Sequence, residues 1–295
     1  MLISVCICTY KRAHIVNTLA SINRLNLPPL ASLEVIVVDN DSAQFAKELI
    51  EQVRIDFKYP LYYLTQNEQN ISAARNLCLD KASGEWIALM DDDEVADENW
   101  LLNLYSSALQ YQADIVCGRV HSTYPAGTEK WIIEGGFFDR KRHANGKVLT
   151  SCAANCTLIN AAKINGRRFD LSYGRTGGED AEFFNGLHLS GCKIVYCDDA
   201  LVSEEVEKNR LNIGYLITRK MRIGATYSKY RFSQQSAAQK CIYVAKNACL
   251  AITGLLTTLF CLPLGKAVYY NKYLNFIDKY GKLKFLLTGK VKTMY

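Results

Sequence analysis

The chain has 295 residues, of which 49% are hydrophobic and 22% are charged. This composition supports a substantial buried core and excludes a disordered or low-complexity protein. Residues 1–208 carry 20 Lys and Arg against 28 Asp and Glu, whereas residues 209–295 carry 15 against one. We therefore expect two parts that divide near residue 208, and an anionic partner for the basic part.

The first 120 residues alternate short β-branched runs with helical patterns. The expected strands are Leu2–Cys8, Glu34–Asp39, Leu61–Thr65, Trp86–Met90 and Ile115–Val120. The expected helices lie around Ala13–Arg24, Ala43–Asp56, Ile71–Ala82 and Asp97–Tyr111. Strands that are apolar throughout and separated by helices predict a mostly parallel, doubly wound α/β sheet that is covered on both faces.

The pattern becomes less regular after Val148. A strand is expected at Ser151–Ile159, and a second at Lys193–Cys197 that joins the same sheet. Between them, the glycine-rich loop Tyr173–Gly178 leads into a helix that opens with Glu179 and Asp180. Beyond residue 210, the sequence predicts a basic amphipathic helix.

Eleven cysteines are scattered through apolar segments, and no two of them have the C-x-x-C spacing. The N-terminus has no basic segment before an apolar stretch, so no secretory signal is visible. We expect the cysteines to be small buried hydrophobes in a protein of the reducing cytoplasm.

Polar clusters follow three of the expected strands, at Thr9–Arg12, Asp39–Ser42 and Asp91–Glu94. Ligands of such sheets bind outside the carboxyl ends of the strands, so these clusters should face one crevice. Four adjacent carboxylates repel one another unless a cation lies among them. Asp91 and Asp93 share a face of an extended segment, and their hard oxygen atoms suit Mg²⁺ or Mn²⁺. A solvated acidic turn that caps the next helix is the alternative.

Four motifs occur in order along the chain: Val5–Arg12, Val37–Ser42, Ala73–Asn76 followed by Gly84 and Leu89–Asp93, and Gly178–Asp180. Together they resemble the motifs of family 2 glycosyltransferases with the A-type nucleotide-sugar-binding fold. The resemblance covers about residues 1–210 and is strongest to bacterial exopolysaccharide enzymes of the succinoglycan type.

The resemblance implies roles on the donor side of a nucleotide-sugar site. Asp39 would accept a hydrogen bond from the base, although an Asx turn at the strand end is the alternative. Asp91 and Asp93 would hold the metal ion, while the third metal ligand stays open, because Glu204 and Glu205 stand where many relatives have a histidine. The residues implied to contact the nucleotide are Thr9, Tyr10, Arg12, Asp39, Arg75 and Asp92.

The resemblance also makes Asp180 the general base of an inverting transfer, with Glu179 as its acidic neighbour. Carboxylates that serve a helix N-terminus are the structural alternative. Arg219 and Arg222 resemble a basic segment that some relatives place near the diphosphate, although a lipid-facing basic helix explains the pair almost as well.

Residues Asn247–Gly265 contain no charge and are flanked by Lys246 and Lys266. The run is close to the roughly 20 residues that span a bilayer. Its threonines, glycines and Pro263 favour an interfacial or re-entrant hairpin on anionic lipid, and a buried core helix is the soluble alternative. We expect a peripheral or monotopic protein on the cytoplasmic face of the cell membrane.

The function expected from these features is an inverting, metal-dependent glycosyltransferase. The donor would be a nucleotide diphosphate sugar, with a UDP-sugar expected, and the acceptor a lipid-linked saccharide or a surface polysaccharide. The alternative is a non-catalytic, membrane-associated module that binds a nucleotide-sugar or a glycan, and Asp180 favours the enzyme. No dinucleotide fingerprint, P-loop, zinc-protease or serine-hydrolase motif is present. We expect no nucleic acid as a partner, because the basic tail flanks an apolar run.

Overall fold

The structure is a computed structural model that describes residues 1–233 and 235–293. The chain forms two compact units, which we call the sheet unit and the helical unit. The sheet unit comprises Met1–Thr123, Arg140–Arg175 and Glu179–Glu205. The helical unit comprises Tyr124–Asp139, Thr176–Gly178 and Val206–Tyr295.

The change from acidic to basic sequence near residue 208 lies close to the beginning of the last segment of the helical unit. The earlier segment of that unit, Tyr124–Asp139, was not expected from the sequence. It joins the helical unit because Ile132 and Phe137 share a hydrophobic cluster with Leu216 and Leu274. It stays a prediction that the first part is catalytic and that the basic part associates with a membrane.

The sheet unit is built on one mixed sheet whose main strand order is β3-β2-β1-β4-β8-β6-β9-β5, with β7 paired to β9. The neighbours β3, β2, β1 and β4 are parallel, as are β6 and β9, whereas β8 is antiparallel to both β4 and β6. The strands are β1 (Leu2–Thr9), β2 (Ser32–Asp39), β3 (Leu61–Thr65), β4 (Trp86–Asp91), β5 (Glu94–Ala96), β6 (Ile115–Thr123), β7 (Val148–Leu149), β8 (Thr157–Asn160) and β9 (Ile194–Glu205).

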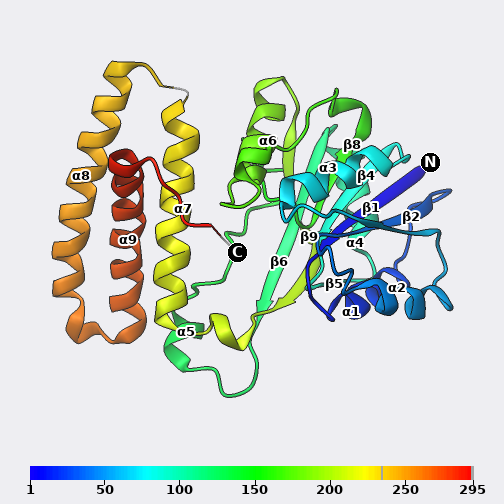
Figure 1. Cartoon of the computed structure of the whole chain (residues 1–295), viewed down its shortest axis with the longest axis horizontal. Helices are drawn as coiled ribbons and strands as arrows, with labels where there is room; N and C mark the ends of the chain where they lie inside the picture. Colours follow the sequence, from blue (N-terminus) through cyan, green and yellow to red (C-terminus); the bar gives the residue numbers. More distant parts are fainter. Residues whose placement is uncertain (234, 294–295) are drawn as a thin grey trace. The chain divides into compact units, whose positions relative to one another are not determined.

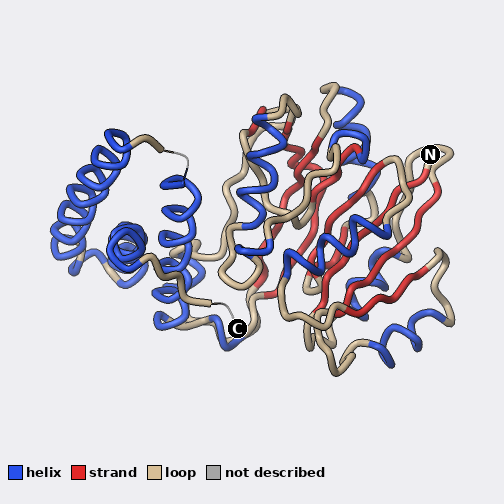
Figure 2. Tube along the Cα trace, turned by 45° about the horizontal axis from the view of Figure 1, so that its top comes forward, coloured by secondary structure: helices blue, strands red, loops and turns tan. Residues whose placement is uncertain are grey.

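Helices cover both faces of this sheet, which confirms the predicted doubly wound architecture (Figures 1 and 2). Side chains such as Ile3, Val5 and Ile7 point from β1 to one face, where they meet α1, α2 and α4. Cys6 points to the other face, towards α3 and α6. The helices are α1 (Ile15–Ile22), α2 (Lys47–Arg54), α3 (Ile71–Lys81), α4 (Trp100–Gln110) and α6 (Glu179–Leu189).

Most expected strands agree with the structure to within three residues at each end, and two differ by more. The segment expected to be extended from Ser151 pairs only from Thr157 onwards, because Cys156 has a left-handed backbone with φ of 53°. The strand expected at Lys193–Cys197 is longer and reaches Glu205, where it pairs with β5 and with the end of β6.

The helical unit contains α5 (Lys130–Glu134), α7 (Ile213–Ser233), α8 (Ala237–Phe260) and α9 (Lys266–Thr288). Within this unit α9 packs against both α7 and α8 (Figure 1). Glycines allow the backbones of α7 and α9 to approach closely: a Cβ atom on Gly281 would lie 2.3 Å from the carbonyl oxygen of Met221. A Cβ atom on Gly224 would lie 2.1 Å from that of Asp278.

The charge-free run Asn247–Gly265 occupies the second half of α8 and the 3₁₀ turn Leu262–Leu264 that follows it. Gly265 then adopts a φ of 91°, a value that suits glycine, and α9 returns along α8. Among the described residues, α8 alone is long and apolar enough to cross a membrane, and 17% of its most apolar window is buried within the protein.

Candidate active site

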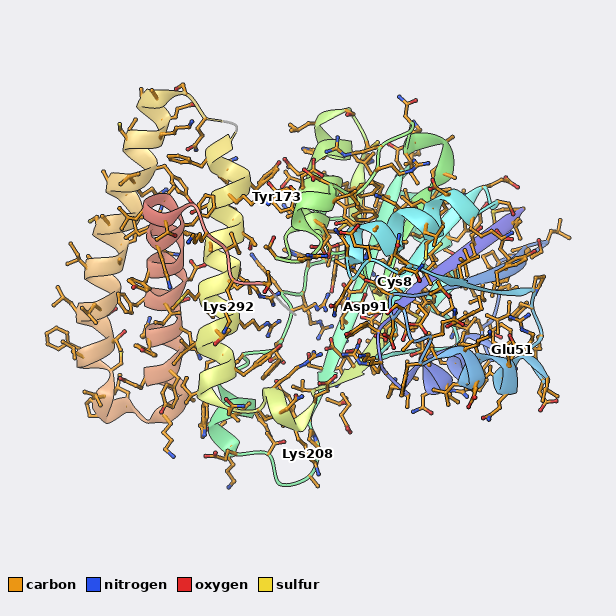
Figure 3. All side chains as sticks on the ribbon, in the orientation of Figure 1. Cys8, Glu51, Asp91, Tyr173, Lys208 and Lys292 are labelled. Atoms are coloured by element: carbon orange, nitrogen blue, oxygen red, sulfur yellow. The ribbon has the colours of Figure 1, made fainter. Side chains whose placement is uncertain are left out.

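The three polar clusters predicted from the sequence come together at one edge of the sheet. In the β1–β2 pair Thr9 lies opposite Asp39, and in the β1–β4 pair Cys8 lies opposite Asp91. Figure 3 labels Cys8 and Asp91, which lie side by side at this edge. The carboxyl ends of β1, β2 and β4 therefore form one polar site, as expected for a doubly wound sheet.

The acidic run Asp91–Glu94 alternates between two environments. Asp92 and Glu94 are buried, whereas Asp91 and Asp93 are partly exposed. Asp92 and Asp93 form the turn between β4 and β5, so the run is not extended as expected from the sequence, although Asp91 and Asp93 are its two partly exposed members.

Asp92 links β4 to the loop that follows β1. Its Oδ2 accepts a hydrogen bond from Thr9 Oγ1 at 2.7 Å, and its Oδ1 accepts one from Arg12 Nη1. Arg12 Nη1 also lies 3.0 Å from Asp93 Oδ2. Burial raises the pKa of Asp92 to about 6, against the opposing effects of Arg12 and Thr9. Asp92 thus has a clear structural role in this loop, and its contact with a nucleotide stays a prediction, as do those of Thr9 and Arg12.

Asp39 is completely buried at the end of β2. Its Oδ1 accepts a hydrogen bond from the backbone of Asp41, as in an Asx turn. Its Oδ2 accepts from the backbone of Ala46 and from the Tyr63 hydroxyl, both within 3.0 Å. The predicted contact of Asp39 with the base stays a prediction. Tyr10, another expected neighbour of the nucleotide, follows β1 directly, and Lys11 Nζ lies 5.3 Å from the centre of its ring.

Arg75 joins two motifs that are far apart in the sequence. From α3, its Nη1 donates to Glu179 Oε1 at 2.7 Å and to Asp180 Oδ1 at 2.6 Å, and its Nη2 lies 3.6 Å from Asp91 Oδ1. The Arg75 side chain is only 10% exposed. The resemblance implied a contact of Arg75 with the nucleotide, but it gave no sign of these ion pairs with the carboxylates of α6.

Asp180 lies in the first turn of α6 beside Glu179. Burial raises the pKa of Asp180 to about 7, because Arg75 only partly offsets desolvation and Glu179 adds a like charge. Glu179 is buried, and its second oxygen, Oε2, has no hydrogen-bond partner among the residues that the structure describes. A carboxyl group with a pKa near neutrality is suited to accept and release a proton.

The buried carboxylate of Glu94 holds the acidic run in place through hydrogen bonds, a role that the sequence did not suggest. Its Oε2 accepts a hydrogen bond from the backbone of Asp91 at 3.0 Å, and its Oε1 accepts from Asn155 at 2.6 Å. Asn155 in turn accepts from Arg140, whose Nη2 lies 3.6 Å from Glu204. Burial raises the pKa of Glu94 well above its usual range. This network fixes the turn between β4 and β5.

The outward pair, Asp91 and Asp93, is the part of this site that fits a divalent cation. The Asp91 side chain is 43% exposed, and Asp93 forms an ion pair with Arg12. Across residues 1–233 and 235–293, no group of three or more His, Cys, Asp or Glu residues is arranged to hold a metal ion by itself. Two carboxylates nonetheless suit Mg²⁺ or Mn²⁺ that takes its other ligands from phosphate and water.

The arginines predicted to contact the diphosphate lie on α7, as the sequence indicated. Arg219 Nη1 donates to the carbonyl oxygen of Phe137 at 3.3 Å, and its guanidinium lies 5.2 Å from the centre of the Phe138 ring. These contacts are within the helical unit. The diphosphate contact of Arg219 and Arg222 stays a prediction.

Comparisons with known proteins agree with this geometry. Residues 4–165 match the family model described as glycosyl transferase family 2. Succinoglycan biosynthesis protein ExoM of Rhizobium meliloti is 37% identical over 229 residues, which cover 77% of this chain and 74% of ExoM. Glycosyltransferase GlyA of Streptococcus pneumoniae is 24% identical over 61% of this chain, but the match covers only 27% of GlyA.

Solved structures show the same fold at low sequence identity. Residues 1–349 of TarS from S. aureus superpose with a TM-score of 0.56 at 16% identity, over 98% of this chain and 92% of that one. The family model covers more than half of the chain, and ExoM is similar over most of its length. The chain therefore belongs to glycosyltransferase family 2, and it is a glycosyltransferase with the A-type fold.

Proposed function

We propose that this enzyme transfers a single sugar, with inversion, from a UDP-sugar to a lipid-linked saccharide or surface polysaccharide at the cytoplasmic face of the cell membrane. One observation carries the proposal: the Arg75 guanidinium contacts Asp180 and Glu179 on α6 and lies within 3.6 Å of Asp91 at the end of β4. A candidate base and a candidate metal ligand thus lie on either side of one buried cation.

This arrangement supports a catalyst over a module that only binds a nucleotide-sugar. A binding module needs the donor-side residues, but it has no use for a partly exposed carboxyl on the acceptor side with a pKa near 7. In the proposed reaction, Asp180 accepts the proton of the acceptor hydroxyl while that oxygen attacks the anomeric carbon. The carbon–oxygen bond to the diphosphate breaks on the opposite side, so the anomeric configuration inverts.

Asp91 and Asp93 are the residues that would hold Mn²⁺ or Mg²⁺. When bound, the ion supplies positive charge to the departing diphosphate. Arg75 keeps Asp180 at the acceptor side of the site through its 2.6 Å ion pair. Asp92 and Thr9 hold the loop after β1 against the end of β4.

The donor and acceptor classes rest on named relatives. TarS of S. aureus has been solved in complex with UDP and with UDP-GlcNAc. ExoM is a succinoglycan biosynthesis protein, which supports a polysaccharide or its lipid-linked precursor as the acceptor. The apolar helix α8 and the basic charge of residues 209–295 support a location at an anionic membrane.

Thermal unfolding with UDP, GDP, dTDP or CMP, each with and without Mn²⁺, tests the donor site, because a ligand of the folded state raises the melting temperature. We expect a manganese-dependent shift with UDP that Asp93→Ala abolishes. Transfer of radiolabelled sugar from UDP-sugars into membrane lipid extract tests catalysis. We expect Asp180→Asn to keep the UDP shift and to lower transfer by about 10²–10⁴-fold.

Asp80→Asn is the matched control, because Asp80 is an exposed carboxylate on α3 that pairs with Arg168. It should leave both measurements unchanged. Normal transfer by Asp180→Asn would show that Asp180 is not the base. A manganese-dependent shift without transfer from any UDP-sugar would favour the non-catalytic binding module.

A further inference from the structure

Helix α8 has the reverse of the pattern expected for a helix of a soluble protein. Its contact side towards α9 carries small or polar residues, namely Asn247, Ala251, Gly254 and Thr258. These positions are spaced by four, three and four residues, so they form one narrow stripe. Gly254 brings the two helices close, since a Cβ atom there would lie 3.5 Å from Cα of Phe276 on α9.

The large apolar side chains of α8 lie on the opposite side, where they are exposed. This outer face follows the helical period over the whole length of α8. Ile242 is 68% exposed near the beginning of the helix, Ile252 63% and Leu256 50% near its middle, and Phe260 80% at its end. A row of this length and exposure is unusual for a surface in contact with water alone.

The threonine hydroxyls of α8 are compatible with an apolar environment, because they are hydrogen-bonded within the helix. Thr253 donates to the carbonyl oxygen of Cys249, Thr257 to that of Gly254, and Thr258 also to that of Gly254, all within 3.0 Å. Each hydroxyl is thus satisfied within its own helix, which is how threonines are accommodated in lipid. From the sequence alone, the same threonines counted against a membrane-spanning helix and in favour of an interfacial hairpin.

The charges that surround α8 exclude a spanning orientation. The helix has 24 residues, about 36 Å, which is enough to cross the roughly 30 Å hydrocarbon core. However, α9 lies along it and carries Lys272, Asp278, Lys279 and Lys282. The turn after α8 leads directly to Lys266, which lies 3.9 Å from Glu129. A spanning α8 would draw these charges into or across the bilayer.

We propose that α8 lies in the plane of an anionic bilayer, with its outer face, defined by Ile242, Ile252, Leu256 and Phe260, among the acyl chains and α9 behind it. Anionic lipid fits because residues 209–295 carry 15 Lys and Arg against a single acidic residue. The inference deepens the proposed membrane location and rests on that part of the proposed function.

Flotation of the full-length protein with phosphatidylglycerol–phosphatidylcholine vesicles tests this orientation. The variants are Ile242→Gln, Leu256→Gln and Phe260→Gln. Glutamine leaves the net charge unchanged and has a good helix propensity, so α8 should stay helical. We expect each to lower the vesicle partition coefficient about tenfold, because each removes a large apolar side chain from the acyl region. The control is Leu109→Gln, a 60% exposed leucine on α4 of the sheet unit, and it should float like the wild type.

Other outcomes would overturn the proposal in distinct ways. An effect of Phe260→Gln without one of Ile242→Gln would mean that only the end of α8 inserts. Unchanged flotation of all three variants, together with a dimer that they convert to a monomer, would assign the face to a second copy of the chain. The manganese-dependent UDP shift is measured on each variant, so a failure of the donor site is distinguished from a failure of this membrane orientation.

Discussion

Replacing Arg75 with methionine should destabilise the sheet unit strongly. Methionine keeps an apolar stem of similar length but leaves Glu179 buried without its cation. Removing one partner of a buried ion pair costs about 3–5 kcal/mol. Asp180 and Asp91 are more exposed, at 27% and 43%, so water can take over part of the role of Arg75 for them. We therefore expect a loss near 3 kcal/mol in the free energy of unfolding.

The loss of unfolding free energy caused by Arg75→Met should increase as the pH rises. Arg75 lowers the pKa of Asp180 against the larger effect of burial, so in the variant this pKa rises further above its present value of about 7. A folded pKa above the unfolded value of about 3.9 means that the folded state binds more protons, and stability then falls as pH rises. The difference between wild type and variant should be larger at pH 8.5 than at pH 5.5, by about 1.4 kcal/mol for each unit by which the pKa of Asp180 rises in the variant.

Urea unfolding of both proteins at the two pH values measures this difference. Arg54→Met is the matched control, because Arg54 is an exposed arginine that pairs with Glu51 on α2, and it should change stability by less than about 0.5 kcal/mol. A loss below about 1 kcal/mol for Arg75→Met, or an equal loss at both pH values, would show that solvent and not Arg75 neutralises the carboxylates of α6.

Two further predictions follow from single contacts. Transfer activity should rise with pH through about 7, because Asp180 must be ionised to accept a proton and burial raises its pKa to that value; a flat profile between pH 5.5 and 8 would argue against its role. Gly281→Ala should destabilise the helical unit by about 1–3 kcal/mol, since its Cβ atom would lie 2.3 Å from the backbone of Met221. The control Gly214→Ala on α7, where the nearest atom is 3.2 Å away, should not lower urea stability.

Local sequence patterns predicted the strands and the polar edge of the sheet well, because both depend on neighbours in the chain. The apolar runs of β1, β2 and β4 and the polar residues that end them follow directly from their sequences. Long-range contacts were not accessible in this way. Arg75 and Glu179 are 104 residues apart, and nothing in either motif indicates their ion pair.

The helical unit shows a second limit of sequence patterns. The charge-free run correctly indicated an apolar helix and a turn, but it did not reveal that small and polar residues face α9 while the large apolar ones face outward. That distinction depends on where α9 lies. Likewise, the segment Tyr124–Asp139 joins the helical unit through packing of Ile132 and Phe137 on helices that follow much later in the chain.

The acidic run Asp91–Glu94 also shows that repulsion between adjacent carboxylates is weak evidence for a metal ion. Arg12 neutralises Asp92 and approaches Asp93, Arg75 lies near Asp91, and Glu94 is buried with hydrogen-bond donors. The protein therefore has internal cations that make the run tolerable without a metal. A metal ion at Asp91 and Asp93 would have to compete with two guanidinium groups.

This competition predicts how the metal should bind. Mn²⁺ alone gains two carboxylates that are already near arginines, whereas Mn²⁺ with UDP also gains diphosphate oxygens as ligands. Thermal unfolding should therefore show a shift with Mn²⁺ and UDP together that is much larger than the sum of the two separate shifts. Strong stabilisation by Mn²⁺ without nucleotide would mean that the carboxylates form a complete metal site by themselves, and that the arginines do not oppose it.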